Sequence, residues 1–197
     1  MAPGGSTDGY SAADWEQRLD LREQLRFGRQ RARTKLTAMG EGWRAAYGVS
    51  VIPRTSLMGC NAYVTAREIE VPWPTTTGAR LYVFAEQIAH VILEHNGRWS
   101  PYIEAFEAQL FAHRLFKQLG MKVPKKPSDR SAVLVFELLK VALAEGTKKI
   151  DPSIAAWAVA CVPSHRLASR SLYDTIQGRV IYPISIAVAR NREANMT

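Results

Sequence analysis

The chain has 197 residues, of which 47% are hydrophobic and 22% are charged. These values exclude an intrinsically disordered protein and are sufficient for one folded domain with its own core. The 26 Lys and Arg residues against 18 Asp and Glu residues give a net charge of +8, which suits an acidic partner such as DNA, RNA or an anionic surface without identifying one. Two cysteines, Cys60 and Cys161, are too few for a disulfide scaffold or an all-cysteine zinc site.

The first ten residues, MAPGGSTDGY, lack the basic start and the apolar stretch of a signal peptide. The apolar run over residues 154–162 is too short to cross a bilayer. We therefore expect a cytoplasmic protein that does not bind membranes and that begins with a disordered tail over residues 1–12.

The first half of the chain predicts a long helix followed by a small sheet. The helix covers residues 13–46 and has acids in its first turn, and Gly40-Glu41-Gly42 is a place where it can break. After it, β-branched and aromatic residues cluster in short runs. These runs, at residues 49–53, 61–65 and 68–71, predict the strands.

Helices dominate from residue 79 onward, so the expected fold class is α+β. The run over residues 79–94 is apolar nearly all round, which predicts a buried helix. A second helix begins at Ser100-Pro101 and ends at Gly120. The elements expected beyond it are a linker at 122–127, helices at 133–144, 154–162 and 164–173, and an edge strand at 180–188.

The densest basic segment lies in the long N-terminal helix. Between residues 22 and 35, six cations stand against a single acid, Glu23. Such a run is either a solvated helix face or a surface that binds phosphates. If nucleic acid binds this chain, the expected contacts are Arg22, Arg26, Arg29, Arg31, Arg33 and Lys35.

Polar residues interrupt the buried helix at Glu86, Gln87 and His90, and buried polar groups need partners. Glu86 and His90 are four residues apart, so they share a face, and Glu107 on the next helix can reach that face if the two helices are antiparallel. A protonated His90 held between the two carboxylates would satisfy all three groups without a metal. At the end of the helix we expect His95 to be exposed.

The two helices resemble those of the ImmA/IrrE-type zinc metallopeptidases and, more distantly, the metallopeptidase half of ArdC-type antirestriction proteins. That family carries H-E-x-x-H-x-x-L-x-H on the first helix and E-A-x-x-F-A on the second. Here His90, Leu93 and His95 match the end of the first motif, and residues 107–112, EAQLFA, match the second. The resemblance implies a zincin-like core, with a long N-terminal helix, a small sheet and two buried active-site-type helices.

The expected domain organisation follows from this resemblance. The tail over residues 1–12 precedes a zincin-like core over residues 13–125. A mainly helical extension over residues 126–197, ending in the edge strand, is not explained by the family core.

The same resemblance implies that catalysis is lost. Glu86 stands where the family has its first histidine ligand, and Gln87 stands where it has the glutamate general base. Glutamine has no basic oxygen, so Gln87 cannot take a proton from metal-bound water. Glu86, His90 and Glu107 could still bind a hard divalent metal. The expected cofactor is therefore none, or a weakly bound Zn²⁺ or Mn²⁺.

The leading hypothesis is a non-catalytic pseudo-metallopeptidase from a bacterial or mobile-element system, which binds a protein regulator or DNA. One alternative is a metal-dependent hydrolase with a rearranged site, in which Glu94 or Glu104 is the base. Another is a basic DNA-binding protein whose zincin likeness is coincidental, although the segment 154–161 has no side chains that read base edges.

Overall fold

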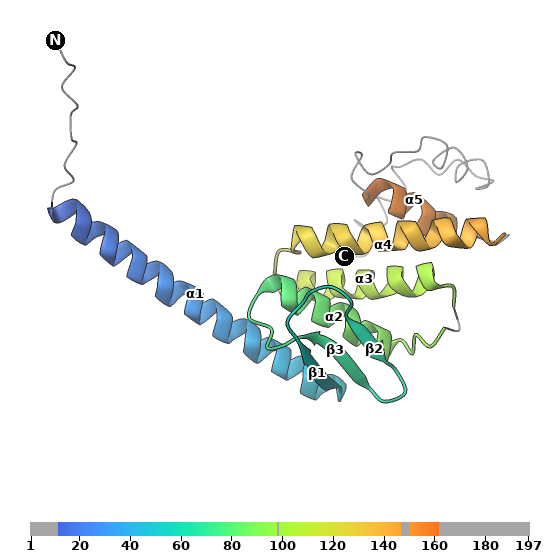
Figure 1. Ribbon diagram of the computed structural model, residues 1–197, viewed down its shortest axis with the longest axis horizontal. Coiled ribbons are helices and arrows are strands. Elements are labelled where there is room, and N and C mark those ends of the chain that lie inside the picture. The colour runs from blue at the N-terminus through green and yellow to red at the C-terminus, as the bar shows by residue number, and fades with distance from the viewer. Residues whose placement is uncertain (1–11, 98, 147–149, 162–197) are drawn as a thin grey trace, which may run out of the picture.

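The computed structural model describes residues 12–97, 99–146 and 150–161. These residues form five helices and one three-stranded sheet, so the chain is an α+β protein that is mostly helical. In Figure 1 the long helix α1 (Ala12–Tyr47) extends away from a body in which the other helices stack beside the sheet. No helix in these ranges is long and apolar enough to cross a membrane. The elements expected at 164–173 and 180–188 lie outside the described residues.

The sheet is mixed, with strand order β1-β3-β2. The central strand β3 (Glu68–Pro72) pairs in parallel with β1 (Ser50–Arg54) and antiparallel with β2 (Asn61–Tyr63). Ile69 and Val71 alternate along β3 and are fully buried in the core cluster that also contains most of the buried residues of α2. The three predicted strands are therefore confirmed, and β3 is the strand whose side chains are buried in the core.

The helix α1 continues without a break through Gly40 and Gly42, where the sequence allowed an interruption. Thr75 is fully buried against this part of α1, and its Oγ1 donates a hydrogen bond to the carbonyl of Leu36 at 2.8 Å. A Cβ at position 40 would lie 2.1 Å from that oxygen. Gly40 is thus the residue that lets α1 approach the loop before α2, and it anchors the helix instead of ending it.

The second half of the fold is a stack of four helices, with α2 against the sheet (Figure 1). Thr77 caps α2 (Gly78–Ile92) by accepting a hydrogen bond from Arg80 N at 3.2 Å. The next helix, α3 (Pro101–Gln118), packs against α2 on one side and α4 on the other. Beyond it, α5 (Pro152–Cys161) packs on α4.

The fourth helix, α4 (Lys125–Ala144), begins earlier than the sequence indicated. Residues 122–127 were expected to be a linker, but the helix already includes Lys125 and Lys126. The expectation is wrong because Pro127 falls in the first turn, where a residue without an N–H costs the helix nothing.

Candidate functional site

The end of α2 folds back on itself and places His95 beside His90. Glu94 adopts a left-handed conformation with φ of 54°, and the backbone N–H of His95 donates to the carbonyl of His90 at 2.9 Å. This is the Schellman arrangement, in which the residue after the left-handed position bonds back to the last turn. As a result His95 is 6% exposed. The expectation that it is exposed was wrong.

His95 is the link between the two helices. Its Nδ1 lies 2.9 Å from Nδ1 of His90, and its Nε2 lies 3.0 Å from Oε2 of Glu107 on α3. An ionised carboxylate can only accept, so Nε2 of His95 carries the proton of that bond. When His95 is neutral, its Nδ1 must then accept from His90. The residues form a chain from Glu107 through His95 to His90, with Glu107 at the exposed end.

The charge state of His90 is the opposite of the one that the sequence suggested. Burial, together with the nearby imidazole of His95, lowers the pKa of His90 to about 4. At neutral pH the ring is therefore uncharged. The structure does not place His90 as a cation between two carboxylates, because its partner is another histidine.

Glu86 lies apart from this chain of three residues. It is buried, and burial raises the pKa of its carboxyl to about 7, although Ser131 and Arg130 on α4 oppose the shift. No hydrogen bond joins it to His90 or Glu107 among the described residues. The two residues share a helix face, as their spacing indicates, but their side chains have different partners. Glu86 bonds to Ser131 on α4, whereas His90 bonds to His95 beyond the end of α2.

The ligands of the family's zinc do not converge in this arrangement. Nowhere in the described ranges do three or more His, Cys, Asp or Glu side chains form a group able to hold a metal ion. The facing Nδ1 atoms of His90 and His95 are engaged with each other, and Glu86 belongs to the α4 side. Gln87, at the general-base position, is half-buried. The donor set as arranged does not fit the zinc site that the resemblance implies.

The two alternative bases have other surroundings. The carboxylate of Glu104 accepts from the backbone N–H groups of Gly97 at 3.1 Å and Trp99 at 3.4 Å, which fixes the turn between α2 and α3. Glu94 is exposed at the end of α2. Glu104 is thus a structural residue of this turn.

Cys60 does not have the surroundings of a nucleophile. It is half-buried, and its thiol lies 3.9 Å from the carbonyl of Ser56. Burial raises the pKa of the Cys60 thiol, although Arg54 opposes the shift. Because the thiolate is the reactive form, the environment works against nucleophilic chemistry.

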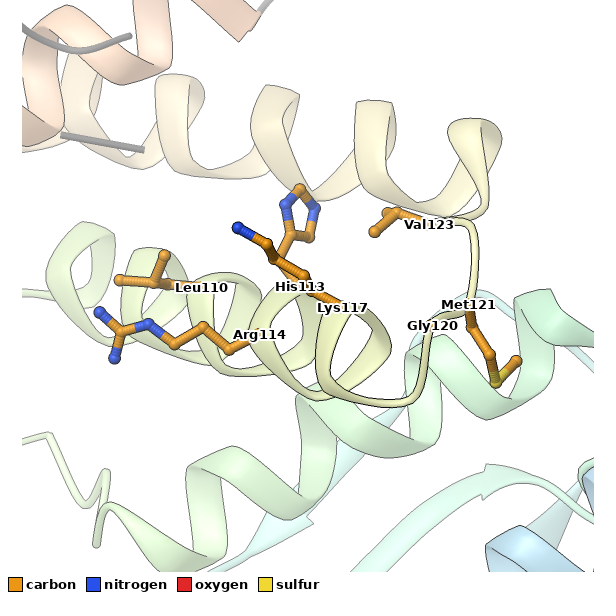
Figure 2. A pocket seen from close by; sticks show the side chains of 7 residues that line it. All are labelled: Leu110, His113, Arg114, Lys117, Gly120, Met121 and Val123. Atoms are coloured by element: carbon orange, nitrogen blue, oxygen red, sulfur yellow. The ribbon is translucent and has the colours of Figure 1, made fainter. Parts of the chain in front are cut away.

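A hollow of about 480 Å³ lies where α3 turns toward α4 (Figure 2). Figure 2 shows His113 and Lys117 pointing into the space between the two helices and Arg114 extending alongside α3. His113 is half-buried and lies 2.9 Å from Ser128 Oγ, so it joins α3 to α4. The lining is basic and apolar and supplies no carboxylate or thiol that could act as a base or nucleophile.

The basic residues of α1 separate into two faces. Arg22, Arg26, Arg29 and Arg33 are spaced four, three and four residues apart, so they form one stripe along the helix. Arg31 follows Arg29 by two residues and Lys35 follows Arg33 by two residues, so Arg31 and Lys35 lie on the opposite side of the helix. All six are exposed, in the part of α1 that Figure 1 shows standing clear of the body. We call the four-arginine stripe the basic face.

Comparison with protein-family models, with curated proteins and with solved structures finds no match to this chain.

Proposed function

We propose that this protein is a non-catalytic nucleic-acid-binding protein, in which the basic face of α1 contacts phosphates. The single observation that carries the proposal is that every residue from 20 to 35 is exposed, and that no acid occurs between residues 24 and 35. Cations without acidic neighbours are left to attract external phosphates, and each contact releases counterions from the nucleic acid.

The shape of α1 supports the same proposal. At 1.5 Å per residue, the exposed span from 20 to 35 is about 24 Å long, which matches roughly two-thirds of a DNA helical turn. The regular spacing of Arg22, Arg26, Arg29 and Arg33 directs the guanidinium groups to one side. A regularly spaced row of arginines suits bidentate contacts with phosphate oxygens.

The body of the protein is, in this proposal, a zincin-like core that has kept its shape without its chemistry. Gln87 cannot serve as a general base. The chain of Glu107, His95 and His90 then has a structural role, joining the end of α2 to α3. A protein that holds its target without cleaving it needs the fold and a binding surface only.

The test compares two double variants that remove the same charge from the same helix. Arg26→Gln with Arg29→Gln changes the basic face, whereas Arg31→Gln with Lys35→Gln changes the opposite side. Affinity for a short fluorescently labelled DNA duplex is measured by anisotropy at low salt, and helix content is checked by circular dichroism. We expect the first variant to bind several-fold more weakly than the second. Equal losses would show that general positive charge, and not this face, is responsible.

A further inference from the structure

A second face of α1 carries apolar side chains into solvent. Leu21 is 57% exposed and Leu25 is 50% exposed. Their spacing continues through Gly28 and Ala32 to Leu36, each step being three or four residues, so all five positions lie on one stripe. We call the part formed by Leu21, Leu25, Gly28 and Ala32 the apolar stripe.

The apolar stripe is continuous with the face by which α1 packs on the protein's own core. Leu36, Met39 and Trp43 pack against the core cluster that contains Phe84 on α2. Toward the N-terminus the same face leaves the body and has no covering side chains among the described residues. A single helix without packing is only marginally stable in water, so a partner on this stripe would stabilise it.

The residues bordering the stripe determine the charge of that partner. One edge of the apolar stripe is formed by Arg22 and Arg29, which also belong to the basic face. Arg31 lies along the opposite edge. Between residues 24 and 35 there are five cations and no acids. Two copies of α1 packed stripe to stripe in parallel would bring Arg22 against Arg22 and Arg29 against Arg29, which disfavours that form of self-association.

The stripe also has a shape. Leucine side chains stand at positions 21 and 25, while Gly28 has no side chain and Ala32 has a short one. A Cβ built at Gly28 meets nothing within 4 Å, so the surface is open at this position. A large apolar side chain from a partner helix can enter this notch, as a knob enters a hole between packed helices.

We propose that the apolar stripe docks an amphipathic helix from an acidic partner protein, with apolar side chains at the centre of the contact and Asp or Glu residues on its edges. The leucines supply the buried contact, and the bordering arginines select the acidic partner and align it. This surface goes beyond nucleic-acid binding, since Leu21 and Leu25 contribute nothing to phosphate contacts.

The experiment uses the full chain and a synthetic helical peptide with leucines at the a and d positions and glutamates at the flanking positions. Binding is measured by fluorescence anisotropy of the labelled peptide. The double variant Leu21→Gln with Leu25→Gln should lose about tenfold or more in affinity, because the apolar contact is removed. The matched control is Phe27→Gln. Phe27 is 61% exposed but lies about half a turn from Leu25, so its loss should change little.

A second peptide, with lysines in place of the glutamates, tests the charge. It should bind at least about tenfold more weakly than the acidic peptide. Equal binding of the two peptides, or an equal loss for Phe27→Gln and the leucine variant, would overturn the proposal. So would light scattering that shows the free chain to be a dimer broken by the leucine variant, because a second copy would then cover the stripe. Arg26→Gln, on the basic face, should weaken DNA binding with little effect on the peptide, so the two proposals can fail separately.

Discussion

The Nδ1 atoms of His90 and His95 lie 2.9 Å apart, so the two imidazoles form a hydrogen bond with each other. His95 is held in turn by Glu107, at 3.0 Å on the neighbouring helix. The residue that the sequence offers as a surviving metal ligand is therefore a neutral ring within a chain of hydrogen bonds. That geometry connects the end of α2 to α3.

Glu86 and His90 should affect stability in opposite directions as the pH changes. The pKa of Glu86 is raised to about 7 in the folded protein, so the folded state binds more protons than the unfolded state, and stability falls as the pH rises from about 4.5 to 7. The pKa of His90 is lowered to about 4, so the unfolded state binds more protons, and stability rises between about pH 4 and 6.5.

Replacing Glu86 by Gln should therefore separate the two effects. Above pH 7 the variant should be more stable than the parent by up to about 3 kcal/mol, because no buried carboxylate has to ionise. Between about pH 4 and 6.5 the stability of the variant should rise with pH, because only the effect of His90 remains. Urea unfolding at a series of pH values measures this, with Glu137→Gln on the surface of α4 as the control. A Glu86→Gln variant with no gain at pH 8 would contradict the burial of an ionisable carboxyl at this position.

Two glycines of α1 should respond in opposite ways to the same substitution. Gly40→Ala should destabilise the protein by about 1–3 kcal/mol, because the new Cβ would lie 2.1 Å from Thr75 Oγ1. Gly42→Ala should be neutral or stabilising by up to about 1 kcal/mol, since nothing lies within 4 Å and alanine favours a helix. Thermal or denaturant unfolding of the two variants provides a matched pair. Equal effects would mean that α1 does not pack against the Thr75 loop as described.

The sequence predicted the elements well where the determinants are local. Apolar periodicity, the serine and proline at the start of α3 and the β-branched runs were enough to place α1 to α3 and the strands. Glycine was less informative, because Gly40 serves a close approach to Thr75 that no local pattern reveals. The start of α4 was predicted too late for a different reason, because Pro127 was assigned to a linker whereas it lies in the first turn of the helix.

The site was harder to predict because it depends on one turn. His95 becomes buried only because Glu94, a residue that is uncommon at positive φ, closes the end of α2. The periodic spacing placed Glu86 and His90 on one face, but it could not say that one would meet α4 and the other His95. The sequence held one indication of this turn. His95 follows His90 by five residues, and no glycine is available to end the helix before Gly97.

We expect the protein to show no peptidase activity, because Gln87 cannot activate water and the family's ligands do not converge. The measurement is cleavage of a fluorogenic casein substrate with Zn²⁺ or Mn²⁺ added, with and without a chelator. Gln87→Glu alone should also be inactive, because it restores the base and not the ligands. Metal-dependent cleavage by the unchanged protein, abolished by the chelator, would contradict the non-catalytic reading and favour the rearranged hydrolase.

The salt dependence of DNA binding by the unchanged chain tests whether the basic face contacts phosphates. If Arg22, Arg26, Arg29 and Arg33 each contact a phosphate, the logarithm of the association constant should fall against the logarithm of salt concentration with a slope of about −3.6. The Arg26→Gln, Arg29→Gln variant should reduce that slope by about 2. Failure to bind a duplex at low salt, or a slope that the variant leaves unchanged, would contradict the assignment of the basic face as the nucleic-acid contact.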